Sequence, residues 1–139
     1  GSFDPSELDE MLNKSKSLNY DFIFASRYQK NSGSDDDTLI TWVGNFIFTK
    51  IGNIFFKLPI TDILYTYVLG KTDYAKKLNL IQKDFGFCIE FPIKAMRASM
   101  KIISTNAYER KRIAGQKKVN AFKDGLKILN HMIYLFFKK

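Results

Sequence analysis

A short basic segment in the last third of the chain has the residue types that bind phosphate. It contains five cations within nine residues, placed around Gly115: Arg110, Lys111, Arg112, Lys117 and Lys118. An arginine can hold a phosphate through two parallel hydrogen bonds, whereas a lysine acts as a point charge. Such a run is a solvated loop in most proteins, but ahead of a helix it could also neutralise a diphosphate or a lipid phosphate.

Three further charged residues stand within or next to apolar segments. Arg27 follows the strand-like run 21–25, and ligands of α/β sheets gather beyond the carboxyl ends of strands, so a phosphate contact is predicted there. Asp62 comes between an apolar helix and an aromatic run, a setting for a turn aspartate, or for a group that orients an acceptor or takes its proton. Glu90 lies near the start of a helix, where the dipole favours a carboxylate, and either a structural role or an arginine pair fits it.

The elements that must position these residues alternate between helices and short strands. Asp37 or Thr38 is expected to cap the longest helix, and Pro59 to stop it. Apolar periodicity and caps predict helices over residues 4–12, 38–58, 72–78, 87–100 and 120–137, and short apolar runs predict strands over 21–25, 63–69 and 101–105. This alternation, without a repeat or a domain boundary, indicates the α/β class.

Composition limits the classes of partner. The 139 residues carry a net charge of +8, which favours nucleic acid, an anionic membrane surface or phosphorylated small molecules. Cys88 is the only cysteine, which excludes an intramolecular disulfide and a cysteine metal cluster, and makes a reducing, cytoplasmic location the expectation. With 45% hydrophobic residues, the chain can form one globular domain or a large piece of one.

Two apolar segments bear on membrane binding. The stretch 39–60 is interrupted by Lys50, and a central lysine costs about 3 kcal/mol on insertion, so a buried or interfacial helix is predicted rather than a spanning one. Its aromatic runs 46–48 and 54–56 are expected to be buried. The last helix ends in an apolar segment followed by two lysines, which suits the cytoplasmic face of an anionic membrane.

Several short motifs occur in an order that resembles a known enzyme family. They are Ser26-Arg27-Tyr28, Thr61-Asp62, Phe85-Gly86-Phe87-Cys88-Ile89-Glu90, the basic segment with Arg112, Gly115, Lys117 and Lys118, and Lys123-Asp124-Gly125. Together they resemble the C-terminal half of the family 2 glycosyltransferases, in particular the dolichyl- and polyprenyl-phosphate hexosyltransferases. The resemblance implies that residues 1–139 form a single partial domain. It would be the C-terminal part of a GT-A fold, with few short strands packed against helices and without the donor-binding half.

The resemblance also implies roles for individual residues. The complete protein would move a hexose from a nucleotide-sugar to a polyprenyl phosphate or a related acceptor, with Asp62 as the catalytic residue. The residues implied in substrate or phosphate binding are Arg27, Glu90, Arg112, Lys117 and Lys118. A magnesium or manganese ion is expected in the complete enzyme.

The chain by itself is predicted to lack a metal site and transferase activity. Asp35, Asp36 and Asp37 stand in a Gly/Ser-rich loop ahead of a helix, a setting for capping and solvation rather than for the metal motif of the family. Residues 2–8 resemble the stretch that follows the metal aspartates in relatives. This resemblance implies that the metal ligands precede residue 1.

Two other functions fit the same composition. A nucleic-acid-binding domain would use the basic loop and the aromatic residues, but these cluster in apolar runs that look buried, so no nucleic-acid partner is expected. A peripheral membrane-binding domain is compatible with the glycosyltransferase interpretation. If half of the sheet is missing, its open strand edges predict a homo-oligomer or a strand-swapped dimer.

Overall fold

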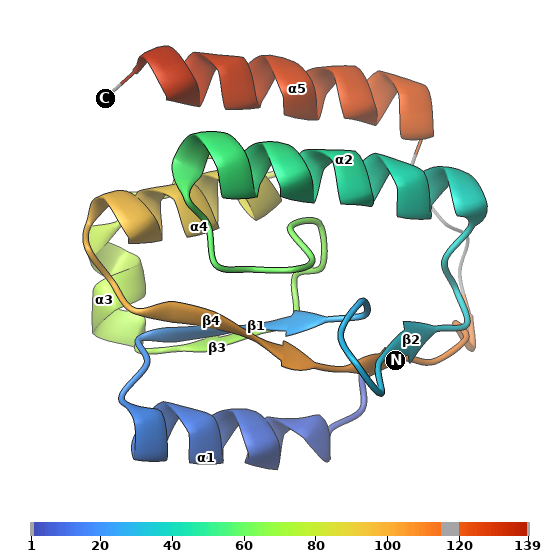
Figure 1. The fold of residues 1–139 in the computed structure, drawn as a ribbon, viewed down its shortest axis with the longest axis vertical. Coiled ribbons are helices and arrows are strands. Elements are labelled where there is room, and N and C mark those ends of the chain that lie inside the picture. Colours follow the sequence, from blue (N-terminus) through green and yellow to red (C-terminus); the bar gives the residue numbers. More distant parts are fainter. Residues whose placement is uncertain (1, 115–119, 139) are drawn as a thin grey trace.

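The chain has a mixed α/β fold in which a small sheet lies between one helix on one face and a layer of helices on the other (Figure 1). The structure, a computed structural model, describes residues 2–114 and 120–138. Its helices are α1 (Glu7–Leu18), α2 (Leu39–Phe56), α3 (Thr72–Lys77), α4 (Gly86–Arg97) and α5 (Ala121–Phe137). The predicted α/β class, with few short strands packed against helices, is confirmed.

The central strand of the main sheet is β1 (Phe22–Ser26). It pairs parallel with β4 (Ile102–Asn106) and antiparallel with β3 (Val68–Gly70). A second sheet consists of β2 (Gly33–Ser34) and β5 (Tyr108–Glu109), paired in parallel. The sequence predicts β1 and β4 but neither β2 nor β5, because a two-residue strand leaves no apolar alternation to detect.

The strand predicted over residues 63–69 is wrong over most of its length, because only the segment from Val68 onward pairs as β3. The residues before it turn toward α2 instead. The amide of Ile63 donates to Thr49 Oγ1 at 3.2 Å, and the amide of Leu64 donates to Asn45 Oδ1 at 3.2 Å. Side chains of α2 thus satisfy amides that a neighbouring strand would otherwise bind, and they draw the adjacent Asp62 under α2.

Two apolar cores lie on opposite faces of the main sheet. Phe22 and Phe24 of β1 belong to the larger core, under α2, α4 and α5, where they meet the Phe91 ring edge-on at 4.9 and 5.4 Å between centroids. Ile23 and Ala25 belong to the smaller core, against α1. Both faces of β1 are therefore buried, which explains why the strand is an uninterrupted apolar run.

Helices α2 and α5 pack against each other and begin at the same end of the molecule (Figure 1). Thr38, one of the two caps expected for α2, caps it with a capping box, and Asn120 caps α5 by accepting from the amide of Lys123 at 3.0 Å. These side chains satisfy amides that a helix start leaves without partners. The positive ends of two helix dipoles therefore share one end of the molecule.

Helix α2 turns its polar residues inward and most of its large apolar residues outward. Asn45 and Thr49 are buried, because they hydrogen-bond the segment before β3. The prediction that the aromatic runs 46–48 and 54–56 are buried is wrong for most of their residues: Phe55, for example, is 57% exposed, and only the last residue of each run, Phe48 and Phe56, packs partly buried against the larger core. By length and hydropathy α2 could cross a membrane, and it is the one helix of that kind within residues 2–114 and 120–138.

The first residues of the chain are fastened to the rest of the protein by aromatic contacts. Phe3 stacks on Tyr67 at 4.8 Å and meets Tyr65 edge-on at 5.3 Å between ring centroids. The guanidinium of Arg110 donates to the carbonyl of Phe3 at 3.0 Å. The N-terminus consequently lies beside the β2–β5 sheet (Figure 1).

Candidate functional site

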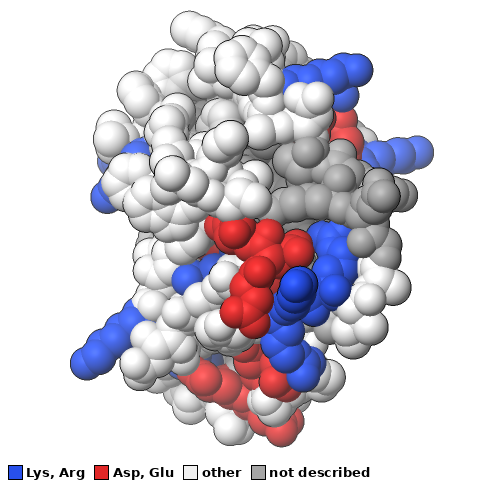
Figure 2. Space-filling view, turned by 90° about the vertical axis from the view of Figure 1, so that its right-hand side faces the viewer, with Lys and Arg blue, Asp and Glu red and all other residues white. Residues whose placement is uncertain are grey.

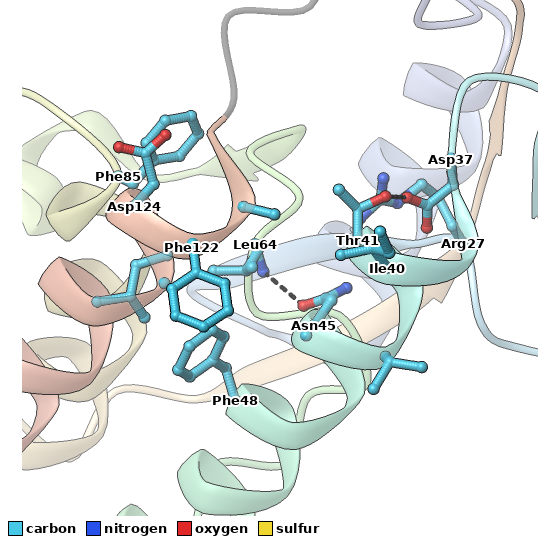
Figure 3. Close-up of a pocket in the computed structure, with 15 residues that line it drawn as sticks. Arg27, Asp37, Ile40, Thr41, Asn45, Phe48, Leu64, Phe85, Phe122 and Asp124 are labelled. Atoms are coloured by element: carbon cyan, nitrogen blue, oxygen red, sulfur yellow. Dashed lines mark hydrogen bonds between the residues drawn. The ribbon is translucent and has the colours of Figure 1, made fainter.

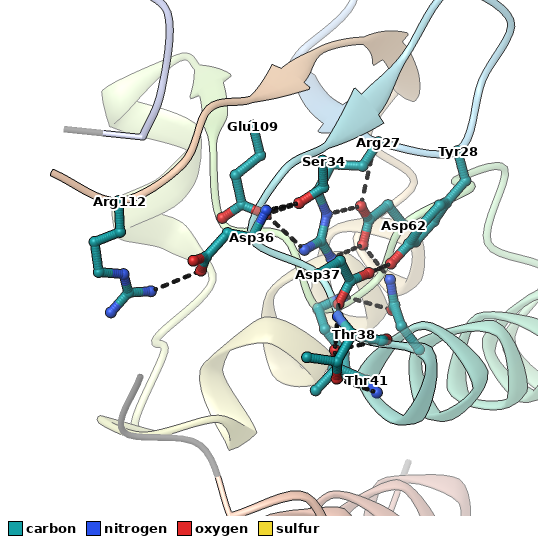
Figure 4. A network of polar contacts seen from close by, with 12 residues as sticks. Arg27, Tyr28, Ser34, Asp36, Asp37, Thr38, Thr41, Asp62, Glu109 and Arg112 are labelled. Carbon is teal, nitrogen blue, oxygen red and sulfur yellow. Dashed lines mark hydrogen bonds and ion pairs between the residues drawn. The ribbon is translucent and has the colours of Figure 1, made fainter. Parts of the chain in front are cut away.

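A buried ion-pair network lies where β1 ends (Figure 4). Arg27 follows β1 directly and donates from Nε to Asp62 Oδ2 at 2.7 Å and from Nη2 to Asp62 Oδ1 at 3.1 Å. It also donates from Nη1 to Glu109 Oε2 at 3.0 Å. The two bonds to Asp62 form a bidentate arginine–carboxylate pair. The structure thus brings together Arg27 and Asp62, which are 35 residues apart in the sequence.

The network keeps the guanidinium of Arg27 charged and fixed. Burial alone would lower the pKa of Arg27, but the hydrogen bonds and the charge of Asp62 outweigh burial and raise this pKa above its ordinary value. The ring of Tyr65 lies against the guanidinium, with 4.6 Å between Cζ and the ring centroid. A guanidinium has five N–H donors. Three are used by carboxylates here, so one on Nη1 and one on Nη2 remain for a ligand.

Asp62 is fully buried, and its oxygens are occupied by donors. Besides the guanidinium, the backbone amide of Arg27 donates to Oδ2 at 3.2 Å, and Asn45 Nδ2 donates to Oδ1. Each oxygen therefore accepts two hydrogen bonds. From the sequence, Asp62 was expected to serve a turn, to orient an acceptor or to take its proton; its contacts in the structure instead orient Arg27.

A second set of contacts ties the network to the start of α2. The hydroxyl of Tyr28 donates to Asp37, which also accepts from the Thr41 hydroxyl and, at 3.1 Å, from the amide of Thr38. Burial raises the pKa of Tyr28 well above its ordinary value, so the phenol keeps the proton that it donates. Asp37 thus has a role at a helix start, as the sequence predicts for its acidic triplet.

Glu109 and Arg112 extend the network toward β2 and the basic segment. The Ser34 hydroxyl donates to Glu109 Oε2 at 2.7 Å, so the carboxylate that faces Arg27 comes from β5 and is bound by β2. Arg112 pairs with Asp36 at 3.3 Å, and its side chain is 37% exposed. Arg112 therefore lies at the rim of the site, connected to Glu109 through Asp36 and Ser34.

A pocket of about 340 Å³ opens beside the network, between the starts of α2 and α5 (Figure 3). Its polar lining residues are Arg27, Asp37, Thr41 and Asn45 on the side of the network and Asp124 on α5. Gly44 and Gly125, one on each helix, contribute no side chain. The apolar lining residues are Ile40, Val43, Phe48, Leu64, Phe85, Ala121, Phe122 and Ile128. A pocket of this kind matches a molecule with a polar head and an apolar body.

Carboxylates outnumber cations in the network. Figure 2 shows Asp and Glu side chains gathered at this end of the molecule, with Lys and Arg beside them. The four carboxylates are Asp36, Asp37, Asp62 and Glu109, and the two guanidinium groups are Arg27 and Arg112. The N-termini of α2 and α5 offset about half a charge each. An anionic ligand here needs further positive charge, and Lys117 and Lys118, which were predicted to bind phosphate, lie outside the described residues.

Glu90 lies in a different environment from Arg27 and Asp62. Its Oε2 accepts from the amides of Ile81 and Gln82 at 3.0 and 2.9 Å, and its Oε1 pairs with Lys94 at 2.7 Å. Burial would raise the pKa of Glu90, but the bonds from Lys94 and the two amides hold it below its ordinary value. These contacts anchor the segment before α4. The cation that pairs with Glu90 is Lys94, whereas an arginine was considered as its partner from the sequence.

Asn45 and Glu109 hydrogen-bond the Arg27–Asp62 pair directly but were not among the predicted site residues. Asn45 is a polar residue inside an apolar helix, and Thr49 falls on the same side four positions later. That spacing places two polar residues on one side of an apolar helix, which indicates a buried polar contact and could have identified Asn45. Glu109 stands next to the basic segment, and its place beside Arg27 depends on the pairing of β2 with β5, which the sequence does not reveal.

Comparisons with protein-family models, with curated proteins and with solved structures find no match for this chain. The resemblance to the glycosyltransferases therefore stays a prediction, and the site is interpreted from its geometry. Within residues 2–114 and 120–138, no group of three or more His, Cys, Asp or Glu side chains is arranged to hold a metal ion.

Proposed function

We propose that this chain forms the acceptor side of a glycosyltransferase that moves a hexose from a nucleotide-sugar to a polyprenyl phosphate or a related lipid acceptor. The observation that carries the proposal is the pocket at the end of β1, which has a charged side and apolar walls. In this proposal the β3–β1–β4 sheet is part of a larger GT-A sheet. The donor-binding half belongs to polypeptide outside residues 1–139.

The polarity of the pocket favours an amphiphilic acceptor over a free sugar. A sugar requires several hydrogen-bonding groups along the walls that surround it. The walls between α2 and α5 are instead mostly apolar, with Val43, Phe48 and Phe122 among their side chains and Asp124 as the one acidic residue that α5 contributes. These side chains fit an isoprenoid chain, which could leave the pocket along the exposed apolar side of α2, where Ile40 is 71% exposed.

The acceptor phosphate would lie against Arg27. Asp62 and Glu109 hold the guanidinium in place, so the two remaining N–H donors are oriented before a ligand arrives. The excess of carboxylates would be balanced by lysines of the basic segment that follows β5. A phosphate oxygen is already anionic when it attacks the anomeric carbon. A strong general base is therefore not required, which agrees with an Asp62 whose oxygens are occupied.

The donor and its metal are assigned to the missing half. A divalent ion would neutralise the leaving diphosphate of the nucleotide-sugar. Because the proposal assigns the donor site to polypeptide outside residues 1–139, we expect the isolated chain to bind acceptor without transferring sugar. We further propose that the complete enzyme works at the cytoplasmic face of a membrane, where a lipid acceptor is presented.

Gly44 offers a direct test, because it lines the pocket and a Cβ added there meets no heavy atom within 4 Å. Gly44→Leu should fill the pocket, while the backbone of α2 tolerates it, since leucine favours helix more than glycine does. Farnesyl phosphate would be titrated against the chain with the fluorescence of Trp42 as readout. We expect binding to the wild type and at least tenfold weaker binding to Gly44→Leu.

Gly44→Ala is the matched control, because it makes the same backbone change without filling the pocket. It should bind farnesyl phosphate as the wild type does. Hexosyl transfer by the complete protein should follow the same order across the three sequences. Equal affinity in Gly44→Leu and wild type, or equal affinity for farnesol and farnesyl phosphate, would contradict the proposed acceptor site.

A further inference from the structure

A second apolar hollow lies between the C-terminal halves of α2 and α5, at the opposite end of these helices from Arg27. It encloses about 220 Å³ and adjoins a hollow of about 580 Å³ that shares Phe55, Phe56 and Phe136 with it. The other residues that line the first hollow are all apolar: Ile51, Leu129, Met132, Ile133 and Phe137. The two hollows form one apolar surface, which we call the α2–α5 surface.

Two exposed cations, Lys57 and Arg97, stand at the edge of the α2–α5 surface. Arg97 donates from Nη1 to the carbonyl of Lys138 at 2.7 Å and from Nη2 to the carbonyl of Leu135. These carbonyls are uncharged, so Arg97 keeps its full positive charge, and three of its five N–H donors remain. Among the described residues, the lining of the two hollows includes no aspartate or glutamate.

The helix dipoles at this end of the molecule do not cancel the positive charge. Helices α2, α4 and α5 all end here (Figure 1), and each C-terminus carries about half a unit of negative charge. Lys57 and Arg97 supply two positive charges against about one and a half negative, and Lys138 adds a third. The edge of the apolar surface is therefore net positive.

We infer that the α2–α5 surface docks on a membrane that contains anionic phospholipid, with a lipid phosphate held by Lys57 and Arg97. Apolar side chains that face water here, such as Phe55 at 57% and Phe137 at 79% exposure, enter the interface between headgroups and acyl chains. The inference does not rest on the proposed glycosyltransferase function, because it uses other residues at the other end of the helices.

A lysine inside the exposed apolar side of α2 distinguishes a membrane from a second protein as the occupant. Lys50 is exposed between Phe46 and Ile54, and its Nζ lies 5.5 Å from the centroid of the Phe46 ring. A lysine next to a bilayer extends its ammonium to the headgroups while its stem stays on apolar surface. At the dry centre of a protein–protein interface the same charge would be left without water, and charged residues are depleted there.

The test uses sedimentation of the whole chain with phosphatidylcholine vesicles, with and without phosphatidylserine, at low salt. Phosphatidylserine should raise the partition coefficient, and the emission of Trp42 should shift to shorter wavelength on binding. Lys57→Asn should reduce partitioning onto the anionic vesicles about fivefold, the factor typical of one basic residue near such a surface. Asparagine suits position 57, because the backbone there has a φ of 56°.

Lys76→Asn is the matched control, because it removes the same charge from exposed α3, away from α2 and α5. It should leave partitioning near the wild-type value. Phe55→Ser should weaken binding to both kinds of vesicle. The inference is overturned if phosphatidylserine has no effect, or if Lys57→Asn and Lys76→Asn behave alike. It is also overturned if soluble glycerol phosphate displaces the chain from vesicles, or if the lipid-free chain forms a dimer that Phe55→Ser dissociates.

Discussion

The pairing of Arg27 with Asp62 can be tested by removing each partner alone and then both. In Asp62→Asn the guanidinium of Arg27 keeps Glu109 as its one carboxylate partner, and in Arg27→Met the carboxylate of Asp62 keeps no cation among its described contacts. Both side chains are shielded from water, at 0% and 11% exposure. An uncompensated buried charge costs about 3–5 kcal/mol, whereas replacing both partners of a buried pair is often close to neutral.

We therefore expect each single substitution to lower the free energy of unfolding by about 3 kcal/mol or more, with Arg27→Met the more damaging. The double variant should be less destabilised than the sum of the two. Urea unfolding followed by circular dichroism would measure this, since a loss of about 3 kcal/mol moves the midpoint by roughly 1.5–2 M at an ordinary slope for a chain of this size.

A matched control is the exposed pair of Lys71 and Asp21, whose Nζ–Oδ1 distance of 2.8 Å is similar. Its lysine is 41% exposed, so the same cycle of substitutions there should give little coupling. The reasoning is refuted if the effects at Arg27 and Asp62 add to within about 0.5 kcal/mol, as they do for independent sites.

Three further substitutions probe other contacts. Glu90→Gln should lower the free energy of unfolding by about 2 kcal/mol at pH 7. Because the pKa of Glu90 in the folded state is lowered from 4.5, the difference in unfolding free energy between variant and wild type should shrink as the pH falls through that pKa. Urea titrations that give the same difference at pH 7 and pH 3 would contradict this. Asn45→Asp, which sets a second carboxylate against Asp62, should destabilise by about 3 kcal/mol or more, so an unchanged thermal melt would show that the contact is absent. Thr38→Ala removes the cap of α2 and should cost about 1 kcal/mol, seen as a melting temperature lower by about 3 °C, and a melt equal to wild type would argue against the cap.

The predicted homo-oligomer can be examined by light scattering of the isolated chain. The outer strands of the main sheet, β3 and β4, have no further strand beside them within the described residues. We expect concentration-dependent self-association through these edges, because unpaired strand edges template pairing with another chain. A monomer at all concentrations would contradict the idea that the sheet continues in missing polypeptide.

Local signals in the sequence were sufficient for most elements of the fold. Thr38 and Asn120 are cap residues placed ahead of long apolar runs, and the helices begin after them. The uninterrupted apolar run of β1 indicates that both faces of this strand are buried. The direction in which α2 faces could not be predicted in this way. Hydrophobicity favours an apolar core, and the contacts of Asn45 and Thr49 with the segment before β3 become visible only in the tertiary structure.

The site could be predicted where its residues lie at the ends of predicted helices and strands. Arg27 was located because it follows a buried strand, and Asp62 because it interrupts two apolar segments. Their direct pairing, and the resulting occupation of the Asp62 oxygens, depends on how α2 packs and on an amide from Asn45. Glu90 shares their chemical type but bonds its own neighbours, because amides of the preceding segment lie within reach of it.

The location of the two ends of the chain decides how the protein can be labelled. Phe3 is held between Tyr65, Tyr67 and Arg110, so a tag or fluorophore on the N-terminus leaves the molecule next to the β2–β5 sheet and the Arg27 network. A label on the C-terminus would instead sit at the end of α5, beside Arg97. A dye at one end would therefore report on acceptor binding and a dye at the other on vesicle contact, and a bulky fusion partner would obstruct whichever of the two it adjoins.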